Sequence, residues 1–209
     1  MFLVAADPLP GQVWPLQAVG HLHVMAERAN SFKVAFLTAN SGVEQVELTT
    51  PWQAVKEAGG EPVLLAPKSG EVKAFHHDVE PGDSFDVDIT VDAADPSDYA
   101  ALVLPGGTTN PDALRLETAA VDFVKAVAKR GTPIAAICHG PWTLVEAGLV
   151  ADRQLTSWPS LRTDITNAGG TWVDVEVQTD TSGGFPLVTS RKPDDLDAFC
   201  AALLDQISG

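Results

Sequence analysis

Short apolar runs alternate with amphipathic segments along most of the chain, and this alternation predicts the fold. Runs typical of buried strands cover residues 33–38, 62–66, 99–104 and 133–137. Segments with apolar residues at helical spacing cover residues 44–58, 117–130, 142–149 and 194–207. Gly59, Gly60 and Gly131 end two of these segments, as glycines often end helices. Strands that alternate with helices in this way predict an α/β fold with a doubly wound, mostly parallel sheet sandwiched by helices.

Two stretches depart from the simple alternation. Residues 67–97 mix turn residues with alternating polar and apolar positions, and they predict a hairpin or excursion with one face in water. Residues 187–190 predict one late strand. Ligands of doubly wound sheets bind at the carboxyl ends of the strands. Cys138 and the Gly106-Gly107 pair follow directly after predicted strands, so we expect both at that edge.

The first 31 residues differ from the rest of the chain. They contain Pro8, Pro10 and Pro15, lack a clean periodicity, and have Asp7 inside their only apolar stretch. A secretory signal would need an early Lys or Arg and an unbroken apolar run. We expect residues 1–31 to be a poorly structured extension, or an upstream start before a more natural beginning at Met25, with an oligomer contact as the alternative. Residues 32–209 are predicted to form one α/β domain.

The chain is strongly acidic, and this charge excludes some classes of binding partner. The chain has 13 Lys and Arg against 28 Asp and Glu, a net charge of −15. Nucleic acids and anionic membrane surfaces repel such a protein, so neither is expected as a partner, apart from a glycated nucleic acid as a substrate.

The two cysteines lie in unrelated contexts and indicate no disulfide framework, which fits a reducing cytoplasm. No apolar run is long enough to span a bilayer.

Cys138 is the strongest candidate for chemistry. It stands where the run 133–137 meets a helical pattern, in the order Cys-His-Gly-Pro. A thiol at such a corner lies beside the amide groups of a helix N-terminus, which favour the thiolate and hence a nucleophile. The alternative is a small buried apolar side chain, which free cysteine often is. Cys200 shows that second pattern, because it lies on the apolar stripe of residues 194–207.

Residues near this corner are candidates for the rest of a catalytic site. The His139 ring is a candidate general base, but adjacent side chains on a tight turn usually diverge, and its backbone N–H is the alternative contribution. Gly106 and Gly107 end the neighbouring strand, where their amides and that of His139 can form an oxyanion hole. Glu44 and Glu47 follow the first strand. A carboxylate there either shares a proton with the thiol or only complements a helix N-terminus.

Signals for metals and cofactors are weak. His76 and His77 are adjacent, so they lack the one-sided spacing of a ligand pair, and no further His or Cys cluster supports them. The sequence has no glycine-rich phosphate loop of the Walker or Rossmann type. We therefore predict no metal and no cofactor.

A series of motifs resembles one known family. They are VAFLT at 34–38, VEQVEL at 43–48, LPGG at 104–107, NPD at 110–112, ICHGP at 137–141, LTS at 155–157, NAGGTW at 167–172 and TSRKPDDL at 189–196. In order and spacing the chain resembles the PfpI-type intracellular proteases and deglycases, within the class I glutamine amidotransferase-like superfamily. The resemblance implies a flavodoxin-like fold in a single domain. It also implies a site at a subunit interface, in a homodimer or hexamer.

The same resemblance implies a role for each matching residue. Cys138 corresponds to the nucleophile, and Glu47 corresponds to the carboxylate that hydrogen-bonds it. His139 corresponds to a histidine that pairs with an acidic residue of a neighbouring subunit, and Asp112 stands at that acidic position. Gln45 replaces an acidic residue often seen there, which affects only a peripheral contact.

These observations predict a cysteine-dependent hydrolase. The resemblance implies repair of small carbonyl adducts of methylglyoxal or glyoxal, as by protein deglycases, in a stress response. One alternative is a peptidase that uses the same residues for acyl transfer on a peptide. Another is a non-catalytic redox sensor or chaperone in which Cys138 is oxidised. Residues 190–193 contain no His-x-Glu, which argues against transfer of amide nitrogen from glutamine.

Overall fold

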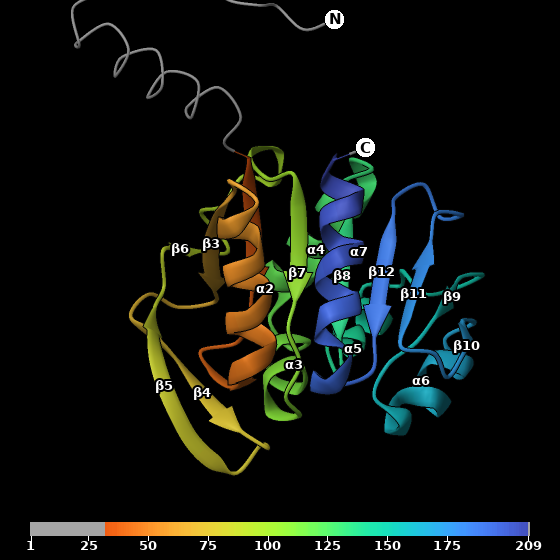
Figure 1. Cartoon of the computed structure of the whole chain (residues 1–209), viewed down its shortest axis with the longest axis horizontal. Helices are drawn as coiled ribbons and strands as arrows, with labels where there is room; N and C mark the ends of the chain where they lie inside the picture. The colour runs from red at the N-terminus through yellow and green to blue at the C-terminus, as the bar shows by residue number, and fades with distance from the viewer. Residues whose placement is uncertain (1–31, 209) are drawn as a thin grey trace, which may run out of the picture. The chain divides into compact units, whose positions relative to one another are not determined.

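A seven-stranded sheet forms the centre of the protein (Figure 1). The structure is a computed structural model that describes residues 32–208. The strand order is β11-β12-β8-β7-β1-β3-β6, and all neighbours are parallel except β11 and β12. The strands are β1 (Lys33–Leu37), β3 (Glu61–Ala66), β6 (Ile89–Thr90), β7 (Ala101–Leu104), β8 (Ile134–Ile137), β11 (Val177–Asp180) and β12 (Leu187–Ser190). The predicted α/β fold with a mostly parallel sheet is confirmed.

Helices cover both faces of this sheet. On one face lie α2 (Gln45–Glu57) and α7 (Leu196–Ser208), which are in front of the sheet in Figure 1. On the other face lie α3 (Thr109–Leu114), α4 (Thr118–Lys129), α5 (Pro141–Glu146) and α6 (Arg162–Asn167). Three short 3₁₀ turns complete the helical elements of the described residues, at Pro96–Asp98, Pro159–Leu161 and Pro193–Asp195. The helices predicted at 44–58, 117–130 and 194–207 correspond to α2, α4 and α7.

The strand β1 shows why its sequence is apolar without alternation. Val34 and Phe36 pack into the core layer beneath α2 and α7. Ala35 and Leu37 pack into the layer on the opposite face. All four side chains are fully buried. A parallel strand covered on both faces has no wet side, so polar residues are excluded from these four covered positions, and only Lys33 at the start of the strand is exposed.

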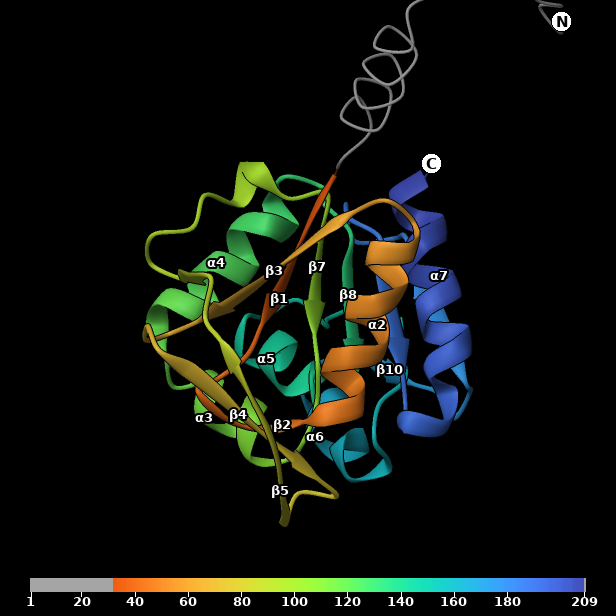
Figure 2. The same ribbon diagram turned by 60° about the vertical axis from the view of Figure 1, so that its left-hand side comes forward.

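A smaller sheet stands beside the carboxyl ends of the central strands (Figure 2). It consists of β2 (Ser41–Glu44), β4 (Glu71–His76) and β5 (Glu80–Asp86) in the order β2-β4-β5. The antiparallel β4 and β5 form the hairpin predicted within residues 67–97. The prediction was wrong at one point. Residues 89–90, expected within the excursion, pair with β3 and form β6 of the central sheet.

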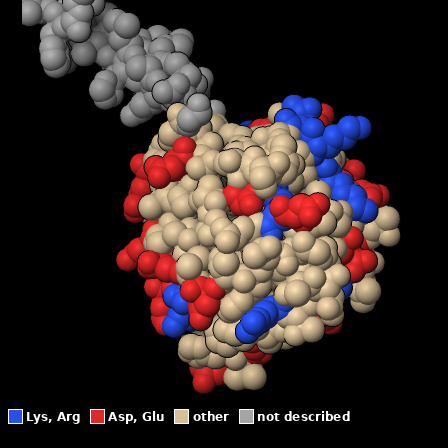
Figure 3. Space-filling model, turned by 90° about the vertical axis from the view of Figure 1, so that its right-hand side faces the viewer, with Lys and Arg blue, Asp and Glu red and all other residues tan. Residues whose placement is uncertain are grey.

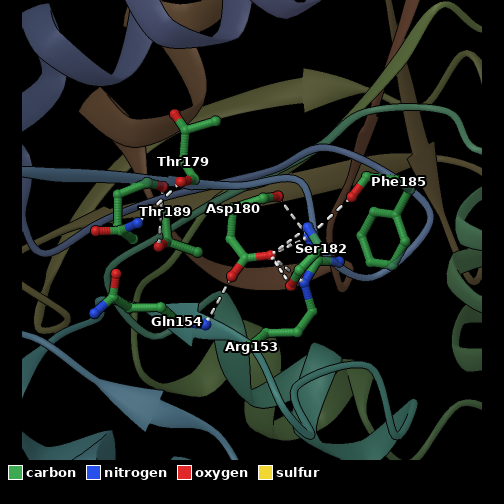
Figure 4. Close-up of polar contacts among 8 residues, drawn as sticks. Arg153, Gln154, Thr179, Asp180, Ser182, Phe185 and Thr189 are labelled. Atoms are coloured by element: carbon green, nitrogen blue, oxygen red, sulfur yellow. Dashed lines mark hydrogen bonds and ion pairs between the residues drawn. The ribbon is translucent and has the colours of Figure 1, made fainter.

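A buried ion pair fixes the two-stranded sheet of β9 (Gln154–Leu155) and β10 (Thr171–Trp172) to β11 (Figure 4). Arg153, only 3% exposed, donates through Nε to Asp180 Oδ1 at 3.0 Å. Its guanidinium group lies 4.2 Å from the centre of the Phe185 ring. The other carboxylate oxygen, Asp180 Oδ2, accepts the N–H of Gln154 at 2.9 Å. The ion pair therefore fixes the start of β9, after which the chain returns toward Cys138.

The surface carries charged side chains of both signs. Acidic side chains lie in several separate groups on the face drawn in Figure 3, with basic side chains between them. Within residues 32–208, no helix is both long enough and apolar enough to cross a membrane. The prediction of an extension over residues 1–31 lies outside the described residues.

Candidate active site

Cys138 occupies a strained corner between β8 and α5. Its backbone φ is +61°, a left-handed value that non-glycine residues seldom adopt and that neighbouring contacts must hold. The Cys138 N–H donates to the carbonyl oxygen of Ser190 at 3.0 Å, and its carbonyl oxygen accepts the N–H of Trp158 at 2.9 Å. Position 140 requires glycine, because a Cβ there would lie only 2.9 Å from the carbonyl oxygen of Ile137. The thiol is thereby held at the carboxyl edge of the sheet.

Glu47, from the first turn of α2, lies against this thiol. The side chain is fully buried, and its Oε2 accepts the Gly106 N–H at 2.9 Å. Its Oε1 has no hydrogen-bond partner among the described residues, and the carboxyl group lies near enough to the Cys138 thiol for each group to affect the pKa of the other. Gly106 makes this approach possible, since a Cβ there would lie 2.5 Å from Glu47 Oε2 and 2.6 Å from Cys138 Cβ. The carboxyl group and the thiol form what we call the Cys138–Glu47 pair.

Burial determines the protonation of the Cys138–Glu47 pair. It raises the pKa of Glu47 from 4.5 to about 8, although hydrogen bonds from Cys138 and Gly106 act in the opposite direction. Burial and the Glu47 charge likewise raise the pKa of the Cys138 thiol and outweigh the N–H groups of Gly107 and His139, which lower it. The resting group is therefore a thiol and not the thiolate that its place at a helix N-terminus predicted. Glu47 therefore keeps its proton at neutral pH. In that state it adds no negative charge beside the sulfur, and its O–H can donate to a thiolate.

The His139 ring lies beside the sulfur rather than diverging from it. Its Nδ1 is 3.2 Å from Cys138 Sγ, and its Nε2 is 3.4 Å from Ser160 Oγ. The Trp158 ring stacks on the imidazole with 5.8 Å between ring centres. Burial lowers the pKa of His139, an effect that the Asp78 charge partly opposes. The ring is therefore neutral at neutral pH, where it can accept a proton.

The predicted oxyanion loop also faces the sulfur. The N–H groups of Gly107 and His139 lie near the Cys138 sulfur and lower the pKa of its thiol. Gly107 has a φ of +79°, which glycine adopts without strain. Fully buried Asn110 donates through Nδ2 to the carbonyl oxygen of Gly106 at 3.0 Å, and so fixes the peptide that carries the Gly107 N–H. Two backbone donors thus point at one place beside the nucleophile, as an oxyanion hole requires.

These residues surround a cavity of about 320 Å³. Its lining consists of Glu44, Glu47, His77, Asp78, Gly107, Thr108, Cys138, His139, Trp158 and Pro193. Asp78, Thr108 and Trp158 were not predicted as site residues. Trp158 directly follows the LTS motif, which could have indicated it, but nothing in the sequence marks Asp78, because the β4–β5 turn brings it to the cavity.

Asp112 does not join this cavity. It lies exposed on α3 and is not among the lining residues. Its predicted pairing with His139 of a neighbouring subunit concerns a second copy of the chain and stays a prediction. His76 ends β4, and His77 lines the cavity. Within residues 32–208, no three His, Cys, Asp or Glu side chains are grouped so that they could hold a metal ion.

Comparison with known proteins identifies the family. The model of the DJ-1/PfpI family matches residues 32–206. The chain belongs to the DJ-1/PfpI family. The resemblance seen in the motifs is thereby confirmed.

Two relatives within the DJ-1/PfpI family carry names that describe an activity. Deglycase PH1704 of Pyrococcus horikoshii is 41% identical over 167 residues, which cover 80% of this chain and 94% of the relative. YraA of Bacillus subtilis, whose name assigns it provisionally to the cysteine proteases, is 36% identical over 169 residues, 81% of this chain and 94% of the relative. These names agree with the predicted cysteine hydrolase and with its peptidase alternative.

Solved structures show the same fold. A two-domain protein from Anabaena variabilis, with a DJ-1/PfpI-like and a ferritin-like domain, matches with a TM-score of 0.77 and 34% identity, over 85% of this chain and 48% of that one. DJ-1 of Schizosaccharomyces pombe matches with a TM-score of 0.72 and 24% identity, over 85% of this chain and 92% of its own. The second likeness supports the fold alone.

Proposed function

We propose that the protein is a cytoplasmic hydrolase that uses Cys138 to repair carbonyl adducts of methylglyoxal or glyoxal, without a cofactor. One observation carries the proposal. Cys138 shares a cavity of about 320 Å³ with the Glu47 carboxyl group, and its sulfur lies 3.2 Å from the His139 ring and near the N–H groups of Gly107 and His139. A cavity of this size suits a small adduct. The relatives named deglycases support this substrate class.

The geometry supports a sequence of proton and bond changes. The neutral His139 ring accepts the proton of the Cys138 thiol as the sulfur attacks the adduct carbon that carries the amine. The C–N bond then breaks, and the departing amine takes this proton from His139 or one from Glu47. A proton then moves between the two adduct carbons and converts the hemithioacetal into a thioester. The Gly107 and His139 N–H groups stabilise the oxyanion that develops. Water cleaves the thioester, which releases a 2-hydroxy acid and restores the thiol.

A second copy of the chain would complete the site. We propose that Asp112 of a neighbouring subunit pairs with the Nε2 of His139 and holds the ring toward the sulfur. An assembly of two or six copies would bring such a residue to each site. The exposed position of Asp112 on α3 leaves its carboxylate accessible to another subunit.

Substitution of the two cysteines tests the proposal. Cys138→Ser should abolish turnover of methylglyoxal and of its arginine adduct, measured as 2-hydroxy acid formed in an amine-free buffer. Cys200→Ser is the matched control, because Cys200 is buried in the α7 core and should keep full activity. Full activity of the Cys138→Ser variant would refute the proposal.

The same proteins distinguish the alternative functions. Cleavage of a fluorogenic peptide that is lost in Cys138→Ser, without turnover of carbonyl adducts, would favour a peptidase. The provisional cysteine-protease name of YraA supports testing this activity. Oxidation of Cys138 to a sulfinate by mild peroxide, with no turnover of either substrate, would favour a redox sensor.

A further inference from the structure

The turn between β4 and β5 reaches the candidate active site from a part of the sequence that no motif marked. His77 and Asp78 both line the cavity, with φ values of +53° and +66°. Two successive non-glycine residues in the left-handed region cost free energy, so contacts outside the turn must hold it. The main polar contact of this turn is made by the Asp78 carboxylate.

Both oxygens of the Asp78 carboxylate bind one residue of the oxyanion loop. Oδ1 accepts the Thr108 N–H at 2.6 Å, and Oδ2 accepts the Thr108 hydroxyl at 2.8 Å. Thr108 directly follows Gly107, whose N–H lies near the Cys138 sulfur in the same cavity lining and lowers the pKa of the thiol. Because glycine rotates freely about φ and ψ, the direction of that N–H depends on the peptides on either side. Asn110 holds the preceding peptide, and Asp78 holds the following one.

We propose that Asp78 is a positioning residue that keeps the Gly107 N–H directed at the Cys138 sulfur. It touches no reacting atom and acts through the Thr108 peptide. The inference rests on the proposed function for its kinetic readout, and on the reactivity of the Cys138 thiol for a second readout that needs no turnover.

The same hairpin has a second anchor, which separates positioning from simple stability. On β5, Asp83 exchanges two hydrogen bonds of 2.7 Å with Gln45, one from each residue to the other. This contact lies outside the cavity lining. The hairpin therefore stays attached when the Asp78 contact is lost. Asp83→Ala removes the carboxylate that accepts from Gln45 Nε2, weakens the hairpin without touching Thr108, and serves as the matched control.

The charge of Asp78 must be separated from its hydrogen bonds. Asp78 raises the pKa of Glu47 together with Glu44, and it also raises the pKa of His139. Asp78→Asn removes the charge but keeps groups that can bond Thr108. Asp78→Gly removes both, and glycine accepts the positive φ without strain. The comparison of these two variants therefore isolates the effect of the hydrogen bonds to Thr108.

The experiment measures turnover of methylglyoxal and the rate at which iodoacetamide alkylates Cys138 at pH 7, in the full chain. Asp78→Gly should lower kcat about tenfold, a fraction of the loss seen when an oxyanion donor is deleted, with KM within about threefold. Asp83→Ala should stay within about threefold of the unsubstituted protein in kcat, and Asp78→Asn should lose clearly less kcat than Asp78→Gly. Thr108→Val, which loses one of the two bonds, should lower kcat about threefold.

Alkylation gives the readout that is independent of turnover. Asp78→Asn should react at least about threefold faster than Asp78→Gly, because only the former keeps the Gly107 N–H on the thiolate. Equal kcat values and equal alkylation rates of these two variants would overturn the inference. An Asp83→Ala variant as impaired as Asp78→Gly would do the same. If the unsubstituted protein does not turn over methylglyoxal, the proposed function fails, while the alkylation comparison still decides the role of Asp78.

Discussion

The Arg153–Asp180 ion pair and the Cys138–Glu47 pair are both buried, yet they are built in opposite ways. Arg153 and Asp180 carry opposite charges, and Asp180 accepts further hydrogen bonds from Gln154 and Ser182. Cys138 and Glu47 are two acids, and Glu47 Oε1 has no oxygen or nitrogen partner among the described residues. The Arg153–Asp180 arrangement stabilises two opposite charges, whereas the Cys138–Glu47 arrangement disfavours the ionisation of both acids at once.

The pKa values follow this difference. Burial raises the pKa of Asp180, but the hydrogen bonds from Gln154, Ser182 and Arg153 outweigh it and lower the value to about 2. Burial of Glu47 outweighs its hydrogen bonds and raises its pKa to about 8. A group with a depressed carboxyl pKa stabilises the folded state at neutral pH, and a group with a raised one destabilises it. The contrast indicates that the Cys138–Glu47 pair is retained for chemistry rather than for stability.

The largest expected effect is that of Glu47→Gln on turnover. Glutamine keeps the shape of the side chain but cannot exchange a proton, so kcat should fall by about 10³-fold. The free energy of unfolding at pH 7 should rise by about 3 kcal/mol, because folding then no longer requires protonation of a carboxylate. Steady-state kinetics and urea unfolding measure both quantities. Glu57→Gln, at the exposed end of α2, is the control and should change neither.

Arg153→Met should change stability in the opposite direction to Glu47→Gln. The variant leaves Asp180 without its buried cation, and the free energy of unfolding should fall by about 3 kcal/mol. Arg115→Met provides the comparison, because the Arg115–Glu146 pair is half-exposed and its loss should cost less than about 1 kcal/mol. Urea unfolding at pH 7 measures both. Equal stabilities of the two variants would remove the contrast between the buried and the exposed ion pair.

A smaller effect is expected from acid. The pKa of Asp180 is lower in the folded protein than its ordinary value of 3.8, so its contribution to stability is present above that value and is lost as pH falls toward about 2. Across this interval the unsubstituted protein should lose about 2 kcal/mol more than Asp180→Asn. Parallel stability curves for the two proteins would contradict the assignment.

Much of the fold and of the candidate site could be predicted from the amino-acid sequence, and the features that could not be predicted have physical causes. Cys138, Glu47 and Gly107 could be predicted together because each follows a strand, and parallel strands end at one edge. Asp78 could not, since its position depends on the register of a hairpin and on two left-handed residues. The Arg153–Asp180 pair was also missed, because nothing local links side chains 27 positions apart.

The protonation of Glu47 at neutral pH is the central claim, and infrared difference spectroscopy tests it directly. Spectra of the unsubstituted protein minus Glu47→Gln should show the C=O stretch of a protonated carboxylic acid at pH 7. This band should disappear with a midpoint near pH 8, the raised pKa of Glu47. A carboxylate band at pH 7, or loss of the acid band with a midpoint near 4.5, would contradict the account.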